Sequence, residues 1–387
     1  MTRLLLLCAV WQLDNCHLIE DLSAELCEDL CALCGKICRE NHSPQRTQRF
    51  AEGPQRNTMK VITLTLIILL SLVSASAQDQ RARLDALRAE GYQALYNLDY
   101  EGARSRFQKM IELAPDHPAG PQCYASSLWV QQLNEAWELK STLYSATAYT
   151  DTKPKVNRKQ ADEFHKWTRL AKQLSEARLR KDPKDIEALY FLGAAEGLEA
   201  AFAGGVERKF MAAFRAGRDA VDHHRDVLKL APDFHDAELT IGLQNYIIGA
   251  LPLPTKMLVA TMGVRGSKKR GLEALERVAA EGKWARDVAN VLLIDLYKRE
   301  KRWKDSIRTA RQLSEKYPRN YLFKLQIADA LTSQIVALKK AKTPVAAEEK
   351  ELQDIFASLS RDKSLDSATR ELVQHRWTIA RQQLDQR

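Results

Sequence analysis

The chain has 387 residues, with 16 glycines, 12 prolines and a formal net charge of +9. Glycine and proline, which form tight turns, are both rarer than in an average protein, so a many-stranded β protein and a low-complexity chain are excluded. Charged residues make up 28% of the chain, which excludes a protein with many membrane spans. Length alone allows two or three ordinary domains.

Residues 1–58 differ from the rest of the chain because they are rich in cysteine. Cys27, Cys31, Cys34 and Cys38 lie close enough together to hold a zinc ion or an iron–sulfur cluster. The usual zinc pattern has two separated cysteine pairs, whereas these four are packed together. We therefore interpret residues 1–58 as an upstream extension that is disordered or not translated.

Residues 59–77 have the pattern of a secretory signal peptide. A basic start at Lys60 is followed by an apolar run over 61–73 and by a triplet of small residues at 75–77. The apolar run is shorter than the ~20 residues that a membrane span needs. We expect a periplasmic or secreted protein, exported across the inner membrane of a bacterium. The alternative is that Met1 is the true start and that residues 61–73 anchor the chain in the inner membrane.

From residue 78 onwards the sequence repeats a pattern of small and apolar positions that ends in a proline. Small residues let two helices approach closely, apolar residues fill the seam to the next pair, and proline ends the second helix. Asp99 is expected to cap the second helix of the first pair. The corresponding positions are Gly91, Ala103, Phe107 and Pro115 in one copy, and Ile294, Ser306, Ala310 and Pro318 in a later copy.

This pattern resembles the tetratricopeptide-repeat family, in which each unit of about 34 residues is a pair of antiparallel helices. Similar sequences occur in exported bacterial repeat proteins of unassigned function. The resemblance implies an all-α protein, a right-handed superhelical solenoid of helical hairpins over residues 78–340. Residues 341–387 are expected to add C-terminal helices that cap the stack with a polar outer face.

The middle units are longer than the family frame, because the prolines that end them lie too far apart in the sequence. We expect the extra residues to form inserts between helices, near 145–160, 200–214 and 249–266. Insertions in repeat arrays tend to lie on one face, which is often the binding face. The relevant prolines are Pro115, Pro183 and Pro232, and new first helices are expected near Ile186, His235, Asp287 and Tyr321.

In repeat arrays of this kind, the first helix of each unit lines a concave groove that commonly binds peptides. Tyrosine suits such a groove because it offers a large contact area and a hydroxyl group. The resemblance implies a non-catalytic protein–protein interaction scaffold that binds a peptide or an envelope protein, without a cofactor. The groove-binding residues predicted by this frame are Arg88, Tyr92, Tyr96, Tyr190, Leu198, Leu243, Tyr246, Asp295 and Arg299.

A second interpretation is a metal-dependent hydrolase. Asp219 and His223 are one helical turn apart, and His224 follows directly. Zinc sites require convergent ligands with ordered outer partners, however, and His224 falls at a seam position. We therefore favour structural histidines, and predict neither a metal site nor catalytic residues.

A third interpretation is a peripheral membrane-associated module that uses residues 246–270. Its first part is the most apolar stretch after residue 78, and a basic run follows at 265–270. Because Pro252 and Pro254 preclude a continuous amphipathic helix, we favour an insert folded over the groove with a solvated basic turn. Elsewhere the basic residues are dispersed, so no nucleic-acid partner is expected.

Overall fold

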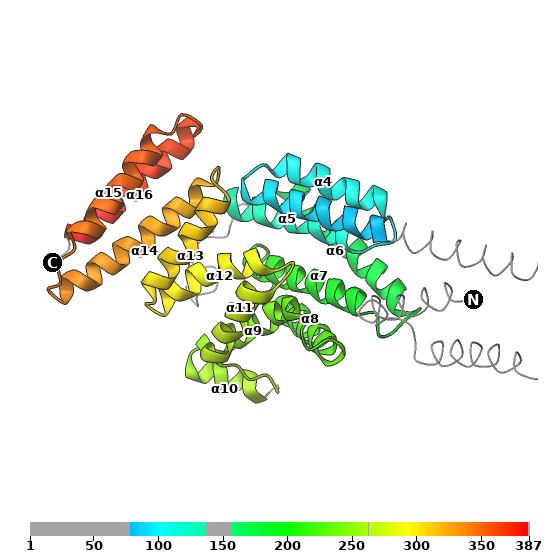
Figure 1. Cartoon of the computed structure of the whole chain (residues 1–387). Coiled ribbons are helices and arrows are strands. Elements are labelled where there is room, and N and C mark those ends of the chain that lie inside the picture. The colour runs from blue at the N-terminus through cyan, green and yellow to red at the C-terminus, as the bar shows by residue number, and fades with distance from the viewer. Residues whose placement is uncertain (1–77, 136–156, 262, 386–387) are drawn as a thin grey trace, which may run out of the picture. The chain divides into compact units, whose positions relative to one another are not determined.

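A computed structural model describes residues 78–135, 157–261 and 263–385. These residues form helices joined by short loops and contain no strand (Figure 1). The predicted extension, signal peptide and cysteine cluster lie outside this described part. The helices pair along the chain as follows: 78–96 with α4 (Tyr100–Leu113), α5 (Ala119–Glu135) with α6 (Arg158–Leu179), α7 (Ile186–Gly205) with α8 (Phe210–Leu230), α9 (Glu238–Ala250) with α11 (Lys268–Glu281), α12 (Arg286–Arg299) with α13 (Trp303–Lys316), and α14 (Tyr321–Lys340) with α15 (Ala346–Arg361).

Three further helices lie outside these pairs. A short 3-10 helix, η2 (His235–Ala237), precedes α9, and α10 (Leu253–Thr261) lies between α9 and α11. The last helix, α16 (Ser367–Asp385), packs against α14 and α15. In Figure 1, α15 and α16 run side by side at the C-terminal end of the chain. The described chain is thus an all-α solenoid of helical hairpins, as predicted.

The ends of the helices follow from local sequence signals. The carboxylate of Asp99 accepts a hydrogen bond of 2.9 Å from the backbone N–H of Gly102, which caps α4 and confirms the predicted cap. Proline cannot continue a helix, and four prolines lie just beyond the ends of the second helices. These four are Pro115 after α4, Pro183 after α6, Pro232 after α8 and Pro318 after α13.

Small residues bring the two helices of a pair into close contact. A Cβ atom added at Gly91 would lie 2.3 Å from the ring of Phe107, so only glycine fits between these helices. In the fifth pair, the hydroxyl of Ser306 donates a hydrogen bond of 2.8 Å to the carbonyl of Ile294. The contact of Ser306 joins two positions that the repeat pattern predicts to be adjacent, and the contact of Gly91 joins a predicted small position to the predicted apolar position of Phe107.

Of the three predicted inserts, the structure confirms one and contradicts another. The insert near 249–266 is confirmed, because α10 lies within it. The insert near 200–214 is wrong, since those residues lengthen α7 and α8, which are joined by the short loop 206–209. The spacing between prolines shows that a unit has extra residues. It does not show whether these residues lengthen the two helices or the loop between them. Most of the insert near 145–160 lies outside the described residues.

Helix 78–96 also contacts pairs that are distant in the sequence. The side-chain amide of Asn320 donates a hydrogen bond of 2.7 Å to the carbonyl of Tyr96, 224 residues away. The rings of Tyr96 and Tyr317 lie 5.0 Å apart between centroids, and Lys283 forms an ion pair of 2.7 Å with Asp85. Helix 78–96 therefore packs on its own partner and also on the fifth and sixth pairs.

Candidate functional site

The predicted groove residues divide into a buried group and a half-buried group. Arg88, Tyr96, Tyr190 and Tyr246 are at most 8% exposed, so their side chains form part of the core. The structure brings Arg88, Tyr92 and Tyr190 together with Trp284. This cluster lies where helix 78–96 packs against later pairs. The remaining predicted residues, Tyr92, Leu198, Leu243, Asp295 and Arg299, are half-buried.

Arg88 lies in an aromatic environment. Its guanidinium carbon is 4.3 Å from the centroid of the Trp284 ring and 5.4 Å from that of Phe191, distances at which a cation is attracted to an aromatic face. Burial alone would lower the pKa of Arg88, but the pKa lies above its ordinary value because Cys123 and Tyr190 favour the cation. Arg88 is therefore a charged core residue.

The carboxylate of Asp236 holds the loop that precedes α12. Its Oδ1 atom accepts hydrogen bonds from the backbone N–H groups of Trp284 at 2.8 Å and Ala285 at 2.6 Å, and Oδ2 accepts one from Lys283 at 3.1 Å. An acidic group at the start of a helix is favoured because it faces unpaired N–H groups and the positive end of the helix dipole. Asp236 thereby positions Trp284 over Arg88.

The histidines at 223 and 224 face different partners. The Nδ1 atom of His223 lies 2.8 Å from a carboxylate oxygen of Glu196, and this hydrogen bond raises the pKa of His223. The Nε2 atom of buried His224 donates a hydrogen bond of 3.1 Å to the carbonyl of Tyr190, while Asp219 is exposed. Among the described residues, no group of three or more His, Cys, Asp or Glu side chains converges as a metal site.

Acid is expected to destabilise the protein through His224. Burial lowers the pKa of His224 to about 4, from an ordinary value of 6.5. As the pH falls below 6.5 the unfolded chain gains a proton that the folded chain resists, so stability is lost between pH 6.5 and 4. The loss amounts to about 2 kcal/mol at pH 5.

Urea unfolding at pH 7 and pH 5 measures this loss, with His224→Gln as the comparison. The variant keeps a donor for the Tyr190 carbonyl but does not titrate, so its stability should change by about 2 kcal/mol less than that of the wild type. The raised pKa of His223 acts in the opposite direction, and it is present in both proteins. Equal pH dependence in the two proteins would contradict a neutral buried His224.

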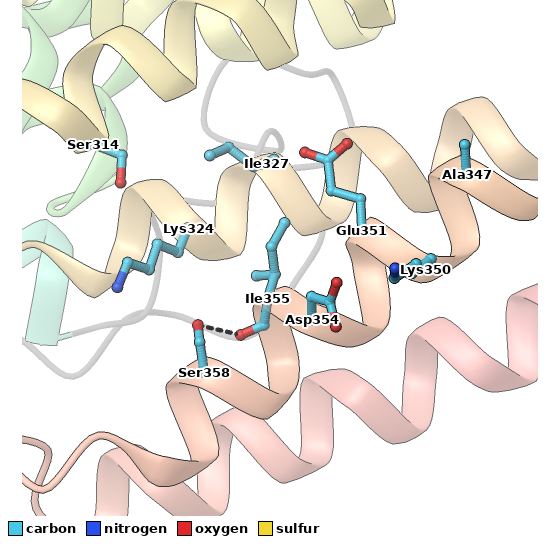
Figure 2. Close-up of a pocket in the computed structure, with 9 residues that line it drawn as sticks. All are labelled: Ser314, Lys324, Ile327, Ala347, Lys350, Glu351, Asp354, Ile355 and Ser358. Atoms are coloured by element: carbon cyan, nitrogen blue, oxygen red, sulfur yellow. Dashed lines mark hydrogen bonds between the residues drawn. The ribbon is translucent and has the colours of Figure 1, made fainter.

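An open cleft lies between α13, α14 and α15. Its volume is about 560 Å³, and it is largely open to solvent. Figure 2 shows Ile355 reaching from α15 towards α14, with Asp354 and Ser358 beside it on α15. The lining residues are Ser314, Lys324, Ile327, Ala347, Lys350, Glu351, Asp354, Ile355 and Ser358.

The cleft has an apolar floor and a charged rim. Ile327 is 5% exposed and belongs to the core, and half-buried Ile355 packs against the same core. Lys350 and Asp354 are exposed and place charges of both signs along α15. Such a surface combines a desolvated centre with polar groups that fix the orientation of a bound chain.

Two predicted groove residues near the C-terminal end of α12, Asp295 and Arg299, differ in their contacts. Asp295 and Lys298 form an ion pair of 2.8 Å. The Nε and Nη2 atoms of Arg299 are buried and have no hydrogen-bond partner within the described part of the chain. Arg299 is half-buried, so these atoms lie beneath the surface and do not form an open binding site.

Residues that were not predicted also shape these regions. Asp236 and Trp284 are 48 residues apart in the sequence, and only the packing of η2 beside the start of α12 brings them together. The cleft residues Ile327 and Ile355 have the spacing of ordinary seam residues. An apolar residue that stays half-buried beside a charged rim has no signature in the sequence of a single chain.

Comparison with solved structures finds one similarity that can be described. The chain is similar to the crystal structure of a thermophilic tetratricopeptide-repeat protein of Thermus thermophilus, with a TM-score of 0.35 and 13% sequence identity. The match covers 65% of this chain and 98% of that chain. No family model matches the sequence, and the search of curated proteins found no match. The description of this chain as a helical-repeat protein therefore follows from its own helical pairs.

Proposed function

We propose that this chain is a non-catalytic scaffold that binds a segment of a protein partner in the cleft between α13, α14 and α15. The observation that carries the proposal is the apolar floor of Ile327 and Ile355 beneath a rim of both charges. Arg311 of α13 pairs with Glu351 of α15, which joins the two helices that border the cleft. A short peptide could bury apolar side chains on the floor and pair with the rim.

This proposal moves the binding surface away from the predicted groove residues. Four of these residues are in the core: Arg88, Tyr96 and Tyr190 lie where helix 78–96 meets later pairs, and Tyr246 lies in a separate cluster with residues of α11 and α12. The cleft instead lies between two second helices, α13 and α15, over the first helix α14. We place the scaffold outside the cytoplasm as part of the proposal, on the signal-peptide pattern at residues 59–77.

Peptide selection tests the cleft. Peptides selected from a random library on the full chain should bind Ser358→Arg at least ~10-fold more weakly, since a long cation would fill the cleft. Ser360→Arg is the matched control, because Ser360 is an exposed serine of α15 that does not line the cleft. Its affinity should stay within ~2-fold of the wild type.

Fluorescence anisotropy with the selected peptides gives both dissociation constants. Peptides that bind the wild type and Ser358→Arg equally well would place the binding surface elsewhere and contradict the proposal. A selection that yields no binding peptide at all would also count against a peptide-binding scaffold.

A further inference from the structure

We infer that α10 and the basic residues at its base form a contact surface for an anionic phospholipid bilayer. This surface is separate from the cleft of the proposed function, and either proposal can hold without the other. None of the residues of α10 is buried. Its three large apolar side chains, Leu253, Met257 and Leu258, are 71%, 64% and 65% exposed. The prediction that this insert folds over the groove is therefore wrong.

Glycines fix the base of the α10 insert. A Cβ atom at Gly249 would lie 2.4 Å from the backbone nitrogen of Lys268, and one at Gly266 would lie 2.5 Å from the Cβ atom of Ile248. The chain that leaves α9 and the chain that enters α11 are therefore in tight contact. The insert projects from this contact, and in Figure 1 α10 lies beyond the ends of α9 and α11.

The insert and its base carry only positive charge. The sequence from Leu239 to Leu272 contains no aspartate or glutamate. Its basic residues are Lys256, Arg265, Lys268, Lys269 and Arg270.

Two of these basic residues are available to an outside partner. Lys268 is paired with Glu300 at 2.7 Å, and Lys269 lies 3.9 Å from Glu273. The exposed side chains of Arg265 and Arg270 have no hydrogen bond or ion pair within the described residues. Both arginines lie at the base of the insert, where the chain returns to α11.

The order of these groups matches the layers of a membrane surface. Apolar side chains on a projecting helix can enter the boundary between headgroups and acyl chains, while cations behind them remain at the level of the phosphates. A second copy of this surface would bring like charges together and is disfavoured. A short projecting helix whose large apolar side chains are all exposed fits a deformable surface better than a preformed protein groove.

None of the described helices is long and apolar enough to cross a bilayer. Because α10 has only 9 residues, the interaction expected of it is contact with the surface of the membrane. Its strength should depend on the apolar side chains and on the anionic lipid together. Each basic residue near an anionic surface contributes a factor of about fivefold in affinity.

Hydrogen exchange of the full chain tests this contact and locates it. With vesicles of phosphatidylglycerol and phosphatidylcholine, peptides covering residues 251–261 should exchange more slowly, and titration gives an apparent vesicle affinity. Leu253→Ser with Leu258→Ser should lower this affinity at least ~10-fold. Arg265→Ala with Arg270→Ala should also lower it ~10-fold or more. Because the readout is local, any binding by residues 61–73 is common to all variants.

Phe210→Ser with Met211→Ser is the matched control, because these side chains of α8 are also exposed, at 48% and 61%. Its local protection at α10 should equal that of the wild type. Absence of protection by the vesicles would overturn the inference, as would equal protection by pure phosphatidylcholine. Protection that depends on protein concentration without vesicles would assign α10 to self-association, and protection only by an acidic protein would assign it to a protein partner. Either result would also overturn the inference.

Discussion

Asp236→Ala is expected to lower the free energy of unfolding by about 4 kcal/mol. Asp236 is 4% exposed and accepts hydrogen bonds from three successive backbone N–H groups, those of residues 283–285. Alanine would leave these donors without their acceptor, and each unsatisfied buried donor costs roughly 1–3 kcal/mol. It would also remove the negative charge that favours the cation of Arg88.

Urea unfolding at pH 7, followed by circular dichroism, measures this loss. Asp233→Ala is the control, because Asp233 is exposed and lies in the same turn. Its effect should stay within about 0.5 kcal/mol. Asp236→Asn, which keeps one acceptor but not the charge, should give an intermediate loss. A loss of less than about 1 kcal/mol for Asp236→Ala would show that water or a shifted loop replaces the carboxylate.

Gly271→Ala is expected to lower the free energy of unfolding by about 3 kcal/mol. A Cβ atom at Gly271 would lie 2.6 Å from the backbone nitrogen of Tyr246 and 2.7 Å from the carbonyl oxygen of Gly242. Both atoms belong to the backbone of α9, so the clash can be relieved only by moving one helix away from the other. The added methyl group therefore acts against the packing of the whole pair.

Gly217→Ala is the matched control for this substitution. Gly217 also lies inside a helix, α8, but a Cβ atom there would meet the Cβ atom of Ala200 at 3.6 Å, which is an ordinary contact. Alanine should therefore stabilise this helix by up to about 0.8 kcal/mol. Thermal and urea unfolding compare the two variants. If both substitutions changed the free energy of unfolding in the same direction, the close approach of α9 and α11 at Gly271 would not be the cause.

The fold could be predicted because its signals are local. Four prolines lie just past the ends of second helices. The first helices that begin at Ile186, Arg286 and Tyr321 start within a residue of the expected positions. The predicted start near His235 corresponds to η2, which leads directly into α9. Caps, prolines and small residues at helix seams act within a few residues, and a single sequence displays them directly.

The surfaces could not be predicted in the same way, because they depend on contacts between distant residues. The frame places Arg88 and Tyr96 on an open groove, yet they are buried when helix 78–96 meets Trp284 and Tyr317. A periodic pattern contains no information about contacts between residues about 200 positions apart. The apolar insert was recognisable from composition, but whether α10 would cover a groove or project from the chain depended on how α9 and α11 pack.

The hydrogen bond between Tyr96 and Asn320 has a consequence for folding. In an open repeat array each unit contacts only its neighbours, so structure can spread along the chain as it is synthesised. Here part of helix 78–96 acquires its partners only when residues near 320 are available. Bringing the two ends of so long a segment together costs conformational entropy, which slows this step of folding. The early pairs are therefore expected to form first, with Tyr96 exposed until the later residues pack on it. We therefore expect rapid local assembly of the helical pairs, followed by a late, long-range step that joins helix 78–96 to the fifth and sixth pairs.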